Sequence, residues 1–217
     1  MKVKNCVVVD YGFGNIYSVC NALSYIGVNV FRTAKPAEIL DSDYVILPGV
    51  GSFYRAQESL KKRGIEDALK FFLEKERPFL GICLGMQLMM DGSDEDRPSA
   101  GLGYIPGTVS RIRSKHSEKK LKLPHIGWSP VFLNNDFSNE LMLLDRELET
   151  DYYFVHSYMC CPDSSEHIYG DTVYGGVRFP AIIGRGNALG VQFHPERSGK
   201  NGLQFLVNFF QGIGNGS

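Results

Sequence analysis

A cysteine flanked by glycines, in the segment PFLGICLGMQLMM at residues 78–90, restricts most strongly how this chain can fold. A short apolar run precedes Cys83 and a helix-like stretch follows it, so the cysteine stands where a strand turns sharply into a helix. Such a turn needs neighbours with little or no side chain. The thiol is then lifted out of the sheet edge beside the first helical N–H groups, which favour a thiolate. A buried structural cysteine in a strand-to-helix crossover is the alternative, since buried cysteines are common.

Strand and helix patterns alternate before this turn. We expect strands at residues 3–9, 28–33 and 43–49, and helices at 16–26, 53–62 and 65–76. The alternation predicts an α/β fold with a doubly wound, mostly parallel sheet. After residue 100, short segments rich in glycine, proline and aromatic residues predict a small additional antiparallel sheet, with a last helix at 202–212. The length suits a single domain over residues 1–217.

Composition excludes several classes of function. A formal net charge of -1 with 22% charged residues gives no reason to expect a nucleic acid or an anionic membrane as partner. The apolar runs are far too short to span a bilayer. The five cysteines have neither metal-like nor disulfide-like spacing, which fits a reducing compartment and predicts a cytoplasmic protein. The charged run at 113–122 is typical of a solvated loop.

A second chemical group stands at the end of another predicted strand, in GVQFHPERSG at residues 190–199. A thiolate nucleophile needs a general base, and that base needs a group to orient it. Residues i and i+2 of an extended backbone share a face, so the carboxylate of Glu196 can orient the ring of His194. A strand-end histidine beside a surface glutamate is the alternative. Because ligand chemistry in such sheets gathers at the carboxyl ends of strands, we expect Cys83 and His194 to face each other.

Together, GICLGMQ and FHPE resemble the signature of the class I, triad-type glutamine amidotransferases. The resemblance extends to the glutaminase subunits of imidazole glycerol phosphate synthases and covers nearly the whole chain, through VVVDYGFGNIYSV, LPGVGSF, GICLGMQLM, GLGYIPG, LPHIGWS, YYFVHSY and GVQFHPERS. It implies that Cys83 attacks the side-chain amide of L-glutamine to form a thioester. His194 would act as base and then as acid toward the departing ammonia, and Glu196 would orient His194.

The resemblance also implies how the substrate is held. The oxyanion would be bound by N–H groups of Leu84 and of the PGVG turn, at Val50 or Gly51. In the family, rotation of this turn couples hydrolysis to the partner, so we expect a weak glutaminase when the chain is alone. Gln87 lies one helical turn after the cysteine and shares its face. The substrate's α-amino and α-carboxylate groups would be bound by Gly51, Gln87 and the backbone at His156, Ser157 and Tyr158.

By the same resemblance, the chain forms a heterodimer with a (β/α)₈ cyclase subunit. That subunit would receive the ammonia for histidine biosynthesis, and no metal or organic cofactor is implied. Asn15, Trp128 and Arg197 are the interface candidates, although a tryptophan can equally belong to the core. The chain departs from the commonest family pattern at Ser129, where asparagine is usual, and at Ser52, where alanine is usual.

Four alternatives remain at this point. DYGFGN invites a dinucleotide-binding turn, but Tyr17 stands where a third glycine belongs. A paralogous glutaminase would supply ammonia for amidino groups on bacterial surface sugars. A cysteine hydrolase of related fold would not need Gln87. A catalytically silent interaction subunit would be expected to lose a member of the triad, and Cys83, His194 and Glu196 are all present.

Overall fold

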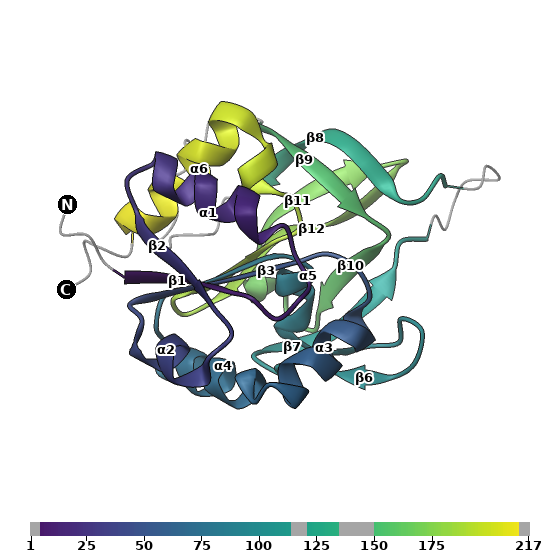
Figure 1. The fold of residues 1–217 in the computed structure, drawn as a ribbon. Coiled ribbons are helices and arrows are strands. Elements are labelled where there is room, and N and C mark those ends of the chain that lie inside the picture. The colour runs from purple at the N-terminus through teal and green to yellow at the C-terminus, as the bar shows by residue number, and fades with distance from the viewer. Residues whose placement is uncertain (1–4, 114–120, 135–149, 213–217) are drawn as a thin grey trace.

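A nine-stranded sheet forms the centre of the molecule. The computed structural model describes residues 5–113, 121–134 and 150–212. Half of the sheet is parallel and consists, in spatial order, of β2 (Asn29–Thr33), β1 (Asn5–Val9), β3 (Tyr44–Gly49), β4 (Phe79–Cys83) and β13 (Ala188–Val191). The other half continues antiparallel through β12 (Val177–Arg185), β11 (Ile168–Tyr174), β8 (His125–Leu133) and β9 (Thr150–His156). Figure 1 shows the two halves joined into one sheet.

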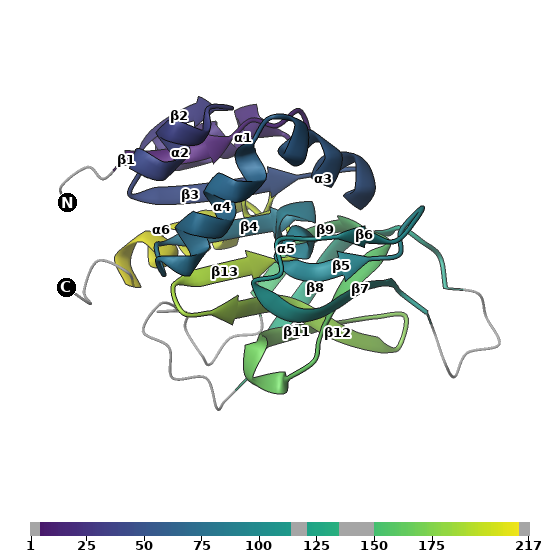
Figure 2. The same ribbon diagram turned by 90° about the horizontal axis from the view of Figure 1, so that it is seen from below.

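Helices cover both faces of the parallel half. On one face lie α1 (Ile16–Tyr25) and α6 (Gly199–Gly212), and on the other α2 (Pro36–Asp41), α3 (Phe53–Lys62) and α4 (Ile65–Glu74) (Figure 2). In β1, Val7 and Val9 pack with α2 to α4, whereas Cys6 and Val8 pack with α1 and α6. Strands buried on both faces explain why these segments are continuously apolar in sequence. None of the helices in the described ranges is long and apolar enough to cross a membrane.

A second, four-stranded sheet packs beside α5 (Leu84–Leu88). Its order is β10 (Tyr158–Pro162), β7 (Ile105–Arg111), β5 (Met90–Ser93) and β6 (Ser99–Ala100). Ile105, Val109 and Cys160 from this sheet join the hydrophobic cluster formed by α2 to α5. Two short 3₁₀ helices, η1 (Ser165–His167) and η2 (Pro195–Arg197), complete the described elements.

The predicted fold class is confirmed, and the structure adds detail to it. Most of the late strands extend the large sheet, which is therefore mixed, and the small sheet also recruits β5 and β6 from before residue 101. Strand periodicity identifies strands but not their distant partners. Helix α2 was not predicted, and the expected helix after Cys83 ends at Leu88. Residues 114–120 of the predicted loop lie outside the described residues.

Helix α1 begins and ends as its sequence predicts. The Asn15 side chain accepts a hydrogen bond from the Ser18 N–H at 3.4 Å, which caps the first turn. Gly27 has a φ of 82°, a left-handed conformation that costs glycine little, and it follows directly on the end of the helix.

The glycines around the cysteine allow α5 to lie directly on the sheet. A β-carbon on Gly85 would lie 1.7 Å from the Leu47 carbonyl oxygen of β3, and one on Gly81 would lie 2.6 Å from the Gly85 carbonyl oxygen. Helix and strands therefore meet backbone to backbone. The chain can make this approach directly after β4 because Cys83 adopts a φ of 53°.

We expect Gly85→Ala to lower the free energy of unfolding by about 3 kcal/mol or more, because the new methyl group has no space. In an ordinary helix the same change stabilises by up to about 1 kcal/mol. Urea unfolding measures the difference. The matched control is Gly27→Ala, which meets no atom within 4 Å and should cost only about 1 kcal/mol for its backbone conformation. Equal losses in the two variants would contradict the packing argument.

Candidate active site

Cys83 stands at the carboxyl end of β4, between the ends of β3 and β13. Its backbone has φ 53° and ψ -107°, which is rare for a residue with a side chain, and only 5% of its surface is exposed. Helix α5 contains only five residues, so its dipole is small. Stabilisation of a thiolate here must come mainly from neighbouring side chains.

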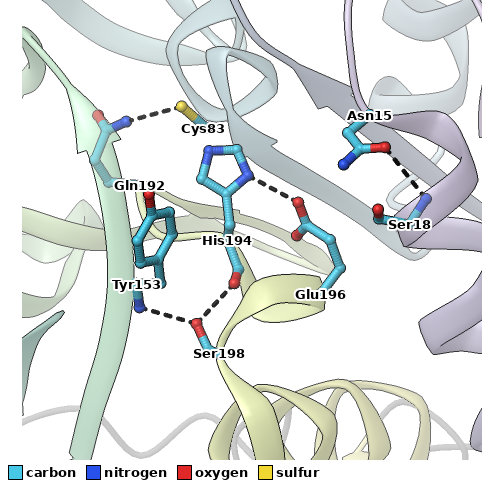
Figure 3. Close-up of polar contacts among 8 residues, drawn as sticks. All are labelled: Asn15, Ser18, Cys83, Tyr153, Gln192, His194, Glu196 and Ser198. Carbon is cyan, nitrogen blue, oxygen red and sulfur yellow. Dashed lines mark hydrogen bonds and ion pairs between the residues drawn. The ribbon is translucent and has the colours of Figure 1, made fainter. Parts of the chain in front are cut away.

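His194 and Glu196 form a buried pair beside Cys83 (Figure 3). The histidine Nδ1 lies 2.8 Å from Glu196 Oε1, and the two side chains are 4% and 2% exposed. A carboxylate can only accept, so Nδ1 carries the hydrogen and Nε2 is left for the sulfur. Among the described residues, Nε2 has no hydrogen-bond partner, and neither does Glu196 Oε2. The ring is thus oriented by one nitrogen and available for proton transfer at the other.

Neighbouring charges set the protonation state of His194. Burial lowers the pKa of His194, but the Cys83 sulfur and the Glu196 carboxylate outweigh burial and raise it above its ordinary value. The raised pKa favours the imidazolium form of His194 beside the Cys83 sulfur. This is the state that a cysteine nucleophile requires.

Ser198 connects the His194 segment to β9. Its hydroxyl donates to the His194 carbonyl oxygen at 2.7 Å and accepts from the Tyr153 N–H at 3.0 Å (Figure 3). The His194 N–H in turn donates to the Tyr153 carbonyl oxygen at 2.9 Å. Two links therefore hold the backbone of His194 to that of Tyr153: a direct N–H to carbonyl hydrogen bond and a bridge through the Ser198 hydroxyl.

A cavity of about 380 Å³ opens in front of Cys83. Eight residues singled out in the sequence line it, namely Val50, Gly51, Cys83, Leu84, Gln87, His156, Ser157 and Tyr158. Gly51 has a φ of 107°, a conformation that favours glycine. Ligand cavities of this size bury most of a small molecule. The structure thus gathers these residues from three separate segments around the cavity.

Glu95 also lines this cavity and was missed in the sequence. The Phe53 N–H donates to its Oε2 at 3.0 Å, and the Ser52 hydroxyl donates to Asp96 Oδ2 at 2.9 Å. Burial raises the pKa of Glu95, while the hydrogen bond from Phe53 acts in the opposite direction. These contacts connect the loop after β5 to the turn that contains Gly51. An acidic residue in a polar loop gives no sequence signal for such a position.

Two glutamines form hydrogen bonds behind the nucleophile. Gln87 Nε2 lies 3.2 Å from the Tyr158 carbonyl oxygen and 3.2 Å from Gln192 Oε1, and Gln192 Nε2 lies 3.6 Å from the Cys83 sulfur. Gln192 is completely buried. No role was assigned to it in the sequence, although a polar residue inside the apolar run GVQF, two positions before His194, was a usable signal.

The three interface candidates lie on one side of the molecule. Trp128 is 55% exposed, which excludes the core placement, and its ring contacts that of Tyr153 at 6.1 Å between centroids. The Arg197 guanidinium lies 4.6 Å from the centre of the same tyrosine ring. Asn15 is exposed and begins α1, which packs against η2. Within the described ranges, no three His, Cys, Asp or Glu side chains are grouped to hold a metal ion.

Two further histidines are buried beside the cavity in the uncharged state. Burial lowers the pKa of His125 to about 4 and that of His156 to about 3. Their ring nitrogens lie 3.2 Å apart, and His125 Nδ1 donates to His156 Nε2, so protonation of His156 would set two donors against each other. Neither ring has a carboxylate partner among its hydrogen bonds.

We expect acid to destabilise the protein through these two histidines. Below an ordinary histidine pKa of about 6.5, these two rings bind protons in the unfolded chain but stay neutral in the folded chain. The free energy of unfolding therefore falls as the pH falls. From about pH 7 to about pH 4, His125 alone should cost about 3 kcal/mol. Urea unfolding across this range measures the slope. His125→Phe should flatten it, and an unchanged slope would contradict the assignment.

Comparisons with known proteins bear on the family and the fold. A family model described as glutamine amidotransferase class-I matches residues 7–213. The imidazole glycerol phosphate synthase subunit HisH of Bacillus cereus (strain B4264) is 42% identical over 207 residues, covering 95% of this chain and 93% of that protein. The chloroplastic imidazole glycerol phosphate synthase hisHF of Arabidopsis thaliana is 42% identical over 202 residues, 93% of this chain but 33% of that longer protein. The solved structure of PurLQS from Thermotoga maritima has the same fold, with a TM-score of 0.75 at 18% identity over 97% of this chain and 99% of that chain.

Proposed function

Because this chain belongs to the class I glutamine amidotransferase family, we propose that it is the glutamine-hydrolysing subunit of an imidazole glycerol phosphate synthase. The observation that carries the proposal is the buried sulfur–imidazole–carboxylate arrangement, in which Cys83 borders a cavity of about 380 Å³. Relatives that carry the synthase's name match nearly the whole chain. This favours the histidine pathway over the surface-sugar pathway.

The proposed reaction uses Cys83 as nucleophile. The thiolate attacks the side-chain carbonyl carbon of glutamine, and the resulting oxyanion collapses as the His194 imidazolium gives its proton to the departing nitrogen. Ammonia leaves and a γ-glutamyl thioester remains. Neutral His194 then removes a proton from water, and the hydroxide adds to the thioester. Collapse of this second oxyanion releases glutamate and restores the thiolate–imidazolium pair.

Groups that line the cavity complement the rest of the substrate. The N–H of Leu84 and an N–H of the turn at Val50 or Gly51 would bind the oxyanion. Gln87 and the backbone from His156 to Tyr158 would bind the α-substituents. Glu95 is the acidic group on the cavity wall, so it suits the α-ammonium group of glutamine.

A (β/α)₈ cyclase subunit is the proposed partner, in a heterodimer. The plant relative supports this pairing, because it is a longer single chain named as the whole synthase. The surface with Trp128, Arg197 and Asn15 lies beside the triad, so ammonia released there could pass to a partner without entering solvent. All five cysteines are free, which supports the cytoplasmic location included in the proposal.

We expect Cys83→Ala to lower glutamate production by about 10⁴-fold or more, measured with glutamine in the presence of the cyclase subunit. The affinity label 6-diazo-5-oxonorleucine should attach to Cys83 in the unaltered protein, detected by mass spectrometry of peptides. Equal turnover by the alanine variant would refute the proposed mechanism. Labelling elsewhere in the chain would remove the assignment of the nucleophile.

We expect Trp128→Ala to weaken binding of the cyclase subunit by about 10- to 100-fold, because exposed tryptophans act as anchors when an interface buries them. Isothermal titration calorimetry measures the affinity. Tyr25→Ala is the matched control, since Tyr25 is 81% exposed at the opposite end of α1 from Asn15. Equal affinities for both variants and the unaltered protein would place the interface elsewhere.

A further inference from the structure

A continuous series of buried polar groups leads to the nucleophile from the side opposite the His194–Glu196 pair. It runs from Ser129 through His125, His156, the Tyr158 carbonyl, Gln87 and Gln192 to the Cys83 sulfur. Each of the side chains in it is buried. We propose that Gln192 is a further catalytic residue that donates a hydrogen bond to the sulfur. His156, His125 and Ser129 are positioning residues that fix the Tyr158 carbonyl oxygen, which through Gln87 holds the Gln192 amide in the donating orientation. The inference rests on the proposed function and deepens it.

The direction of every hydrogen bond at the histidines follows from one carbonyl oxygen. Tyr158 O lies 2.8 Å from His156 Nδ1 and can only accept, so Nδ1 carries a hydrogen. In a neutral ring His156 Nε2 is then an acceptor, and His125 Nδ1, 3.2 Å away, must donate to it. His125 Nε2 is left to accept from the Ser129 hydroxyl at 2.9 Å. The series runs in one direction only while both rings are uncharged.

The same carbonyl oxygen orients the two amides. The Gln87 atom 3.2 Å from Tyr158 O must be its nitrogen, because the other amide atom is also an acceptor. That nitrogen lies 3.2 Å from Gln192 as well, so Gln192 must present its oxygen there. The nitrogen of Gln192 is therefore the atom 3.6 Å from the sulfur. A reversed amide would place oxygen against a thiolate.

Packing keeps the two histidines in this state. The His125 ring is stacked against Phe154 and Tyr174, with centroids 4.9 Å and 4.1 Å away. The His156 ring lies edge-on to Phe179. An imidazolium in such surroundings would lose its hydration, and burial accordingly lowers the pKa of both rings.

An N–H group aimed at the sulfur contributes in a specific way. Charge-assisted hydrogen bonds to a buried anion are among the strongest in proteins. Gln192 would stabilise the thiolate before attack and again when the thioester is hydrolysed. Because the amide touches the sulfur rather than the bound glutamine, its removal should change kcat and leave KM nearly unchanged.

The first test compares three variants of the full chain with the cyclase subunit present. Gln192→Leu should lower kcat for glutamine by about 10- to 100-fold with little change in KM. Gln192→Glu, which sets a carboxyl group against the sulfur, should be at least as inactive. Gln57→Leu is the matched control and should keep normal activity, because Gln57 is a buried glutamine in α3 whose amide makes no hydrogen bond to any residue that the structure describes.

The second test addresses the positioning residues. Ser129→Ala should lower kcat by about 3- to 10-fold, and Ser129→Thr, which keeps the hydroxyl, should restore it. Nitrogen-15 NMR of the unaltered chain reads the tautomers directly and does not depend on any variant folding. Both His125 and His156 should be neutral with the hydrogen on Nδ1 at neutral pH. A hydrogen on Nε2 of either neutral ring, or an imidazolium, would overturn the assigned direction.

The outcomes separate the two proposals. If the unaltered protein releases no glutamate, the proposed function fails. If it hydrolyses glutamine and Gln192→Leu does so equally well, only the role of Gln192 fails. A rise in KM with unchanged kcat would likewise refute contact with the sulfur and assign Gln192 to substrate binding.

Discussion

The direct contact between α5 and the sheet is the constraint on which the site depends. Gly85 lies against the Leu47 carbonyl oxygen, with no side chain between helix and strand. This contact allows the chain to reverse at Cys83, which then stands at the edge of β4 with the end of β3 on one side and that of β13 on the other. The turn with Gly51 and the segment with His194 follow those two strands. A wider separation of helix and sheet would move the Cys83 sulfur away from both that turn and the His194 segment.

The three buried histidines near Cys83 show how hydrogen-bond partners determine whether an imidazole ring is charged. His194 donates to a carboxylate and lies beside a sulfur, so it favours the imidazolium. His156 donates to a carbonyl oxygen, and His125 donates to a neutral ring, so burial dominates in both. A carboxylate carries a full charge that offsets the loss of hydration, and a carbonyl dipole does not. The same residue type is therefore favoured as a cation at one position and as a neutral ring at the other two.

Local patterns in the sequence predicted four of the five parallel strands and most of the residues that line the cavity. Helix α3 was predicted at 53–62, as observed, because the pattern that indicates a helix lies within its own residues. The antiparallel half could not be assembled in this way, since β8 also pairs with β11, which follows β9 and β10 in the chain. Gln192 was missed for the same reason: its partner Cys83 is 109 positions away. Glu95 stands in a polar loop, where nothing in the composition distinguishes a cavity wall from a solvated surface.

Strand β9 connects the exposed surface with the chemistry. Near its middle, Tyr153 contacts the rings or charges of Trp128 and Arg197 and is hydrogen-bonded to His194 and Ser198. At its end, His156 borders the cavity. One strand thus contacts the exposed Trp128 and Arg197, the backbone of His194 and the cavity in front of Cys83. A protein bound at Trp128 would therefore act on the strand that also contacts His194 and the cavity. A substitution that alters binding at Trp128 is then expected to alter turnover as well.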